Sequence, residues 1–352
     1  MLPAEGIKLK PVIVTVDTEG HVGADPIRHL VYGETENGRY GVEYIMDIFD
    51  EVHAKVLFFV DFAEAWDYGH DKIERVVRTI IERGHDVGVH IHPDHMADKR
   101  RAFLWQYNRE EQFEIIRKCT ELYTEIVGRQ PLSFRAGKYG ANRDTLDILC
   151  ELGYKYDFSQ FYHQKWCGIN PPITVNAPCS YKNLIEFPVT MHKSIHVGRL
   201  VREDKLDIEQ MTIGELRYGL KQISKAPFEM VATLFLHSFS MLSWYETPDT
   251  PYRDESKIKK VKSAAGYVCE ENGLRYISES ELSSVTVSAE QKAIDSQIVW
   301  PNALRGVFYT YSKAKRIAKR NKKAQRLLFA VRAGIVILFI FALLLLLQLF
   351  GK

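Results

Sequence analysis

The sequence predicts an α/β fold, a (β/α) barrel of about seven parallel strands, with one transmembrane helix near its C-terminal end. Two observations predict the barrel: short apolar runs alternate with longer amphipathic stretches, and polar residues follow several of the apolar runs. A third observation, an uncharged apolar segment late in the 352-residue chain, predicts the membrane helix. We expect residues 1–284 to form one domain.

Strand-like and helix-like segments follow one another along this domain. In its first half, strands are expected at 11–16, 56–60, 86–92 and 132–135, and helices at 41–52, 72–83 and 110–127. In its second half, strands are expected at 154–158, 184–189, 230–237 and 274–278, and helices at 142–152, 208–224 and 256–272, with a proline-rich insert at 170–178. Gly84, Gly128 and Gly153 close three of the helices, because glycine readily ends a helix.

Charge is unevenly distributed along the chain. The formal net charge is only +2, which argues against a nucleic-acid-binding protein. However, no Asp or Glu follows Asp295, whereas 11 of the 47 Lys and Arg residues do. The 36 basic and 45 acidic residues before that point give a net charge of about −9. The chain therefore combines an acidic body with a basic tail.

The tail has the pattern of a membrane anchor. Residues 333–350, AGIVILFIFALLLLLQLF, lack the polar face of a buried core helix and would extend about 27 Å as a helix, enough to cross a bilayer core. A linker at 285–311 and a basic juxtamembrane helix at 312–332 precede them, and the positive-inside rule then places the body in the cytoplasm. The absence of a signal-peptide pattern and the absence of CxxC cysteine pairs agree with a cytoplasmic body. We expect a single-pass anchor in the inner (cytoplasmic) membrane.

Two pairs of potential ligands follow predicted strands. Asp17 and Glu19 have the spacing that directs both carboxylates to one face, where a cation or a proton must relieve their repulsion. His90 and His92 share the same spacing, and with one acid they form a typical divalent-metal ligand set. The alternatives are helix-capping acids and surface histidines.

Two further strands end in single polar residues. Arg135 follows the fourth predicted strand and could hold a carboxylate ionised, or could serve only in a structural salt bridge. His237 ends the apolar run MVATLFLH, where a lone histidine is more often structural. Because chemistry in a (β/α) barrel lies at the carboxyl ends of the strands, both residues become candidates for the same site.

Together these segments resemble the polysaccharide deacetylase family, that is, the NodB homology domain of carbohydrate esterase family 4. The motifs are TVDTEG at 15–20, VLFFVD at 56–61, GHDVGVHIHP at 84–93, FRAGKYGAN at 134–142 and LFLH at 234–237, in that order over roughly residues 10–280. The resemblance implies a deviated (β/α) barrel and a metal-dependent hydrolase. It implies that Asp17 is the general base, that Arg135 orients it, that Glu19 is a metal ligand and that His237 is the general acid.

The metal ligands depart from the family pattern. The two family histidines usually lie four residues apart, but the fourth residue after His90 is Asp94. The resemblance therefore implies His90 and His92 as ligands, with Asp94 or His95 as alternatives to His92. The expected metal is zinc, and cobalt, nickel or manganese would also suit this ligand set.

Other residues are candidates for the substrate site. The resemblance implies that Asp157 tunes His237 or contacts substrate, and Tyr139 and Trp244 are also expected to bind substrate. A cytoplasmic, membrane-tethered enzyme of this kind would most plausibly remove an acetyl or formyl group from an amino sugar on a lipid carrier during glycan biosynthesis. The alternatives are a metal hydrolase of a soluble amide or ester, and a non-catalytic, membrane-anchored sugar-binding protein.

Overall fold

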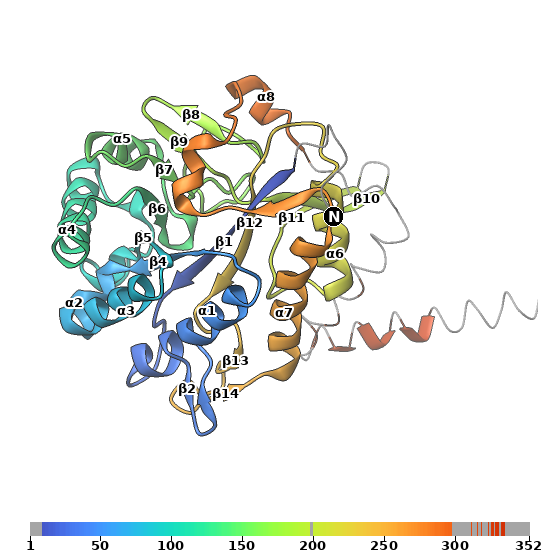
Figure 1. Ribbon diagram of the computed structural model, residues 1–352, viewed down its shortest axis with the longest axis horizontal. Coiled ribbons are helices and arrows are strands. Elements are labelled where there is room, and N and C mark those ends of the chain that lie inside the picture. The colour runs from blue at the N-terminus through green and yellow to red at the C-terminus, as the bar shows by residue number, and fades with distance from the viewer. Residues whose placement is uncertain are drawn as a thin grey trace, which may run out of the picture. The chain divides into compact units, whose positions relative to one another are not determined.

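A nine-stranded, mostly parallel sheet organises the chain in this computed structural model, which describes residues 9–197 and 200–297 and scattered positions between 311 and 334 (Figure 1). The strand order is β12-β1-β4-β5-β6-β7-β9-β8, and β15 pairs with the start of β1. Every pairing is parallel except that of β8 with β9. The strands are β1 (Lys10–Thr18), β4 (Val56–Asp61), β5 (Asp86–Ile91), β6 (Ser133–Ala136), β7 (Tyr156–Asp157), β8 (Cys179–Tyr181), β9 (Leu184–Glu186), β12 (Ala232–His237) and β15 (Leu274–Tyr276).

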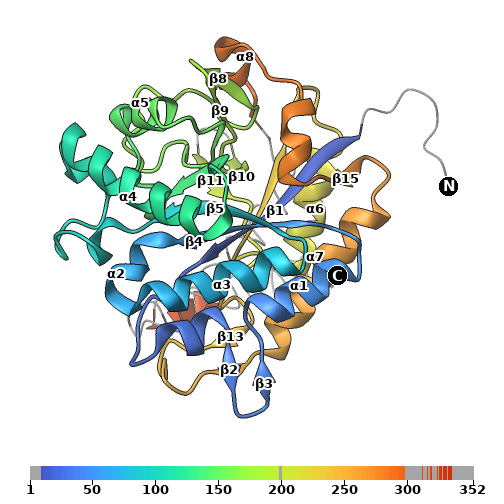
Figure 2. The ribbon, with the colours of Figure 1, turned by 60° about the vertical axis from the view of Figure 1, so that its left-hand side comes forward.

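Helices cover the outer face of this sheet (Figures 1 and 2). In the order α6, α7, α1, α3, α4, α5, each contacts the next. Their bounds are α1 (Val42–Asp50), α3 (His70–Glu82), α4 (Arg109–Val127), α5 (Arg143–Glu151), α6 (Ile213–Ile223) and α7 (Glu255–Glu270). In α3 the buried residues Ile73, Val76, Val77 and Ile80 recur at helical spacing, which explains why one face packs inward.

Short elements complete the described chain. Two short helices are α2 (Ala65–Tyr68) and α8 (Glu290–Ile294), and three two-stranded sheets are formed by β2 (Glu34–Thr35) with β3 (Gly38–Arg39), β10 (Met191–Val197) with β11 (Leu200–Lys205), and β13 (Leu242–Ser243) with β14 (Tyr252–Arg253).

The inner face of the sheet changes from apolar to polar along the strands. Ile13 lies in an apolar cluster with Leu57, Phe59 and Phe158. Because side chains alternate along a strand, Asp17 shares the face of Ile13, and Asp61 shares that of Leu57 and Phe59. The core thus occupies the middle of the strands, and the polar groups gather at their carboxyl ends.

The (β/α) barrel-like prediction is confirmed as a mostly parallel α/β sheet surrounded by helices. The hairpin of β8 and β9 and the hairpin of β10 and β11 were not expected. The expected helix at 208–224 begins only at Ile213, because the Thr212 side chain accepts a hydrogen bond from the Glu215 amide and caps the helix there.

The chain divides into two compact units. The first comprises Met1–His192 and Asp204–Ile298, and the second comprises Lys193–Glu203 and Val299–Lys352. The start of the predicted linker belongs to the first unit, since Ser288 N donates to Pro178 O at 2.8 Å and Asn176 N donates to Ser296 Oγ at 3.1 Å.

The predicted C-terminal segments fall largely outside the part of the chain that the structure describes. The predicted span at 333–350 lies outside the described residues except for positions 333 and 334. Nine of the 21 positions of the predicted basic helix at 312–332 are described, and all nine are helical. Among the residues that are described, no helix is both long and apolar enough to cross a bilayer.

Candidate active site and metal centre

Strand register brings the predicted site residues to one edge of the sheet. Asp17 in β1 is paired with His237 in β12, and His90 in β5 is paired with Arg135 in β6. All four strands are parallel, so these residues lie at carboxyl ends. β4 lies between β1 and β5, yet the side chains meet across the sheet: Arg135 Nη1 lies 2.6 Å from Asp17 Oδ1, and Asp17 Oδ2 lies 4.0 Å from His90 Nε2.

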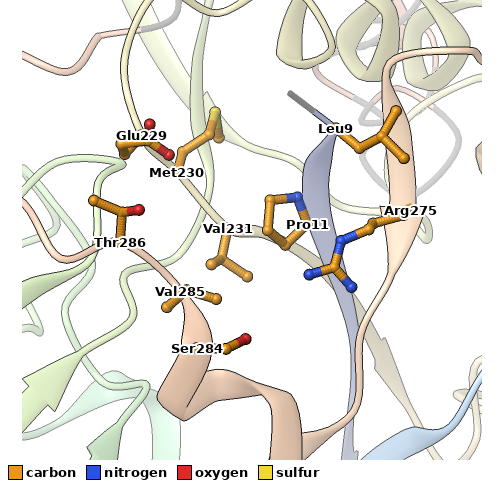
Figure 3. A pocket seen from close by; sticks show the side chains of 9 residues that line it. All are labelled: Leu9, Pro11, Glu229, Met230, Val231, Arg275, Ser284, Val285 and Thr286. Atoms are coloured by element: carbon orange, nitrogen blue, oxygen red, sulfur yellow. The ribbon is translucent and has the colours of Figure 1, made fainter. Parts of the chain in front are cut away.

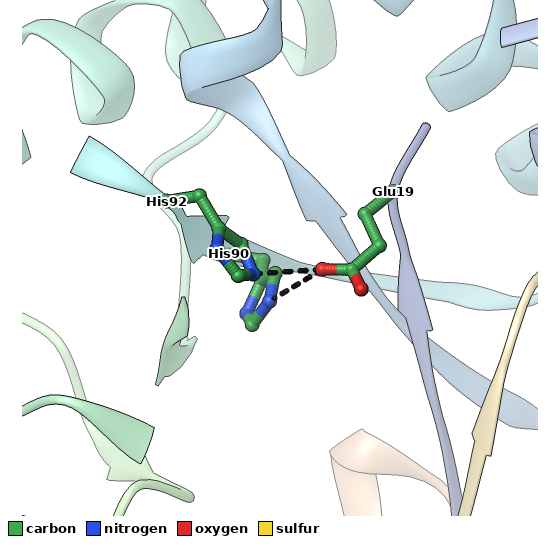
Figure 4. A group of neighbouring side chains, drawn as sticks. All are labelled: Glu19, His90 and His92. Atoms are coloured by element: carbon green, nitrogen blue, oxygen red, sulfur yellow. Dashed lines mark ion pairs between the residues drawn. The ribbon is translucent and has the colours of Figure 1, made fainter. Parts of the chain in front are cut away.

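Glu19, His90 and His92 form one cluster (Figure 4). Glu19 Oε2 lies 2.7 Å from His92 Nε2 and 3.5 Å from His90 Nε2. All three side chains are buried. Burial alone would raise the pKa of Glu19, but the adjacent His92, His90 and His237 hold it well below its usual value. The carboxylate is therefore ionised and directed at two imidazoles.

The two histidines are fixed by their backbone surroundings. His90 Nδ1 lies 2.8 Å from Arg135 O, which assigns its proton to Nδ1 and leaves the Nε2 lone pair towards Glu19. The ring of His92 packs so closely on Gly137 that a Cβ there would lie 2.7 Å from ring atoms. A side chain at position 137 would displace this imidazole, which accounts for glycine at that turn.

This cluster fits a divalent metal ion. His90 Nε2 is buried and has no hydrogen-bond partner among the described residues. One carboxylate and two imidazoles, each able to offer an atom within 4.8 Å of the others, form a donor set that suits zinc and related transition metals. A metal at Glu19, His90 and His92 would satisfy the free Nε2.

A buried ion pair lies beside this cluster. Arg135 Nη1 donates to Asp17 Oδ1 at 2.6 Å, and Nη2 donates to Thr15 Oγ1 at 3.0 Å. The guanidinium is 4.3 Å from the ring centre of Phe59, and the residue is only 1% exposed. The other carboxylate oxygen, Asp17 Oδ2, lies 4.0 Å from His90 Nε2. Arg135 thus fixes one oxygen of Asp17 and leaves the other directed at the cluster.

A second carboxylate, which the sequence analysis missed, holds His237. Glu209 Oε1 lies 2.8 Å from His237 Nδ1 and also accepts a hydrogen bond from Ser240. Burial alone would lower the pKa of His237, but the Glu209 charge raises it to about 9. His237 Nε2 lies 3.8 Å from Glu19 Oε1, so a protonated imidazole edge is directed at the cluster. One signal could have revealed Glu209: Asp207 and Glu209 repeat the spacing of Asp17 and Glu19.

Trp244 lies where it could contact a substrate. Phe239 stacks on the His237 ring at 4.8 Å, and Trp244 contacts Phe239 edge-on at 5.0 Å and His21 at 5.4 Å. Phe239 is buried, whereas Trp244 is partly exposed and His21 is exposed, so these last two rings form an accessible aromatic wall beside the general-acid candidate. Tyr139 differs, because it is buried among Phe161, Phe235 and other apolar side chains.

The structure does not bring Asp157 to His237. Asp157 is fully buried, its carboxylate accepts from Ser159 Oγ at 2.7 Å, and it lies opposite Glu186 of β9. Asp157 therefore neither tunes His237 nor presents itself to a substrate, and Glu209 occupies the position expected of it.

The structure also separates the alternatives to His92. The chain turns into a 3₁₀ helix at Pro93–His95 directly after His92. His95 belongs to a different group, with Asp61 and Glu64, and Asp94 belongs to neither group. The strand spacing of His90 and His92 explains why these two, and not the later residues, meet Glu19.

A cavity of about 280 Å³ lies at the opposite end of the strands (Figure 3). Its lining includes Pro11 at the start of β1 and Val231 just before β12. The six residues from Pro11 to Asp17 span roughly 20 Å of strand, so this cavity is separate from the polar edge.

Comparisons with known proteins identify a family for part of the chain. Residues 33–156 match the family model described as polysaccharide deacetylase, a segment that contains His90, His92 and Arg135. The chain is 28% identical over 132 residues to the peptidoglycan deacetylase-like protein FGM2 of Gibberella zeae. That match covers 36% of this chain and 34% of the relative, so the chain spans about a third of the curated relative's length.

Solved structures share the fold. A Mycobacterium smegmatis protein assigned to the polysaccharide deacetylases has a TM-score of 0.54 at 17% identity, covering 82% of this chain and 96% of that one. PuuE allantoinase has a TM-score of 0.52 at 10% identity, covering 80% of this chain and 91% of that one. Identities this low show a common fold only. The family match supports a polysaccharide deacetylase domain that includes residues 33–156.

Proposed function

We propose that this protein is a metal-dependent hydrolase that removes the N-acyl group, acetyl or formyl, from an amino sugar. The observation that carries the proposal is that three groups of side chains lie together at one edge of the sheet. These are the ligand set of Glu19, His90 and His92, the Asp17–Arg135 pair and the His237–Glu209 pair. The match to the polysaccharide deacetylase family supports a carbohydrate substrate.

The residues of the site would have different roles in amide hydrolysis. A divalent ion at Glu19, His90 and His92 would supply a Lewis acid for the acyl group and for water. Asp17 has one oxygen held by Arg135, so its other oxygen is free to accept a proton from the attacking water.

His237 would supply the second proton. Its raised pKa keeps the ring protonated near neutral pH, and Glu209 fixes its orientation through Nδ1. The Nε2 proton is then available for the departing amine, which must be protonated before it leaves. The partly exposed Trp244, which packs on Phe239 beside this ring, would stack on a sugar face.

We further propose that the sugar is carried on a lipid and is reached at the cytoplasmic face of the inner membrane. The support is the sequence: an acidic body of about −9, 11 basic residues after Asp295 and an 18-residue apolar run at 333–350. Such a tail would hold the site close to lipid-linked precursors. Protease added outside intact cells would leave the body uncut if this orientation is right.

Release of acetate or formate from lipid-linked amino sugars tests the activity. We expect release by the full chain and a loss of at least about 100-fold in kcat for Asp17→Asn, because this change removes the base while keeping the side-chain shape. Asp71→Asn, at the exposed salt bridge with Arg75, is the matched control and should retain full activity.

The choice of substrate decides between the proposal and its alternative. Turnover of a soluble amide, together with no turnover of any amino sugar, would instead favour a soluble-amide hydrolase. The shared fold with PuuE allantoinase makes this alternative worth assaying. Equal activity on soluble oligosaccharides would contradict the lipid-carrier part alone. No activity on any of these substrates in a metal-loaded protein would contradict the catalytic proposal.

A further inference from the structure

A second group of potential ligands lies next to the first. Asp61 ends β4, Glu64 follows in a 3₁₀ helix at Phe62–Glu64, and His95 ends the 3₁₀ helix at Pro93–His95. Each can offer one ligand atom within 4.8 Å of the others. Asp61 and Glu64 are 0% and 1% exposed, so this is a buried group and not a surface cluster of acids.

Each of the two carboxylates keeps one oxygen without a partner. Asp61 Oδ1 accepts from Ala63 N at 3.0 Å and from His92 N at 3.2 Å, and Glu64 Oε1 accepts from Gly20 N at 2.5 Å. Asp61 Oδ2 and Glu64 Oε2 are buried and have no hydrogen-bond partner in the described part of the chain. Within that same part, neither carboxylate has a Lys or Arg within ion-pair distance. Burying two unpaired carboxylates costs several kcal/mol per charge, so this arrangement calls for a positive partner.

His95 has the orientation of a metal ligand. Its Nδ1 lies 2.7 Å from Asp67 Oδ2, and Lys99 also pairs with Asp67. A carboxylate on Nδ1 assigns the proton to that nitrogen and leaves the Nε2 lone pair for a ligand, as in carboxylate–histidine–metal arrangements. His95 Nε2 faces Glu64 Oε1 at 3.9 Å. The alternative explanation, a single proton shared by Asp61 and Glu64, would not account for the direction of the His95 Nε2 lone pair.

We propose that Asp61, Glu64 and His95 bind a second divalent transition-metal ion, such as Mn²⁺ or Zn²⁺. Two carboxylates and one imidazole suit these ions better than Ca²⁺ or Mg²⁺, which prefer all-oxygen sites.

This second ion would also brace the first site. Asp61 accepts the backbone amide of His92, and Glu64 accepts the amide of Gly20, the residue after Glu19. An ion that fixes these two carboxylates therefore fixes the backbone that carries two ligands of the first cluster. Outer supports of this kind change metal affinity by about 10- to 100-fold, so we expect loss of the second ion to weaken the first site by a similar factor.

Metal content of the full chain tests the proposal. After equilibration with Mn²⁺ or Zn²⁺ and removal of free ion, we expect two ions per wild-type chain by elemental mass spectrometry. We expect one ion in Asp61→Asn/Glu64→Gln and one in His90→Ala/His92→Ala. The milder variant His95→Ala should bind its second ion at least about 10-fold more weakly.

A matched control removes two exposed carboxylates elsewhere. Glu110→Gln/Glu114→Gln on α4 should still bind two ions. One ion per wild-type chain, retained by Asp61→Asn/Glu64→Gln and lost from His90→Ala/His92→Ala, would overturn the proposal. If the double variant does not fold, crystals of the wild type equilibrated with Mn²⁺ decide: anomalous scattering at both groups supports the second site, and scattering only at Glu19, His90 and His92 overturns it.

Discussion

Replacement of Arg135 by methionine gives a sharp test of the buried ion pair. Arg135→Met keeps the length and apolar bulk of the side chain but removes the 2.6 Å contact with Asp17 and the 3.0 Å contact with Thr15. It also removes the guanidinium from the face of the Phe59 ring. Asp17, only 5% exposed, would be left as a buried carboxylate without its cation.

The expected cost follows from that burial. Breaking a buried pair by removing one partner destabilises a protein by about 3–5 kcal/mol, whereas replacing both partners with uncharged groups is often close to neutral. We therefore expect Arg135→Met to lower the free energy of unfolding by about 3–5 kcal/mol. Arg135→Met/Asp17→Asn should recover at least about 2 kcal/mol of that loss, because no unpaired charge remains.

Urea unfolding of the wild type, the two single variants and the double variant measures this cycle. A chelator in every sample keeps metal binding from contributing differently to the four proteins. Arg78→Met is the matched control, since Arg78 and its partner Glu74 are both exposed, so its loss should cost less than about 1 kcal/mol. A double variant no more stable than Arg135→Met, or a cost of Arg135→Met equal to that of the control, would refute the reasoning.

Three further results are expected. Burial raises the pKa of Glu279 to about 7, so the folded state binds the carboxyl proton more tightly than the unfolded chain does. The free energy of unfolding should therefore fall by roughly 2–3 kcal/mol as the pH rises from 4.5 to 7. Glu279→Gln should remove this fall when the free energy of unfolding is measured against pH. Glu209→Gln removes the charge that orients His237, and it should lower kcat by at least about 10-fold with little change in KM; an equal rise in KM would point to substrate binding instead. Gly137→Ala should raise the dissociation constant of the first metal by about 10-fold or more, because the new Cβ would lie 2.7 Å from the His92 ring; unchanged affinity by metal titration would contradict that steric argument.

The central strands and the metal ligands could be predicted from local patterns. β1, β4 and β12 contain long apolar runs because both faces of each strand are covered, and such runs are visible without knowledge of the fold. The two-residue spacing of His90 and His92 likewise places both side chains on one face.

The remaining features depend on contacts between distant segments. Glu209 meets His237 because residue 207 bridges to β12. The spacing of Asp207 and Glu209 marks both as candidates, but it does not show that they lie beside this strand. Asp157 was misassigned for the converse reason: its place in β7 was visible, but its burial opposite Glu186 was not. The pairing of Asp61 and Glu64 with His95 depends on how two separate loops fold after β4 and β5.

The register of the parallel strands has a consequence for how such a protein can change. Asp17 is paired with His237, and His90 is paired with both Asp61 and Arg135, so the register of the strands positions these candidate site residues. A deletion of one residue inside β5 would turn both imidazoles to the opposite face and abolish the chemistry. The loops that follow these strands are under no such constraint, because insertions there leave the strand register unchanged. If the proposed function is right, the choice of sugar and the hydrolytic reaction would therefore depend on different parts of the chain, and the first could be altered without rebuilding the second.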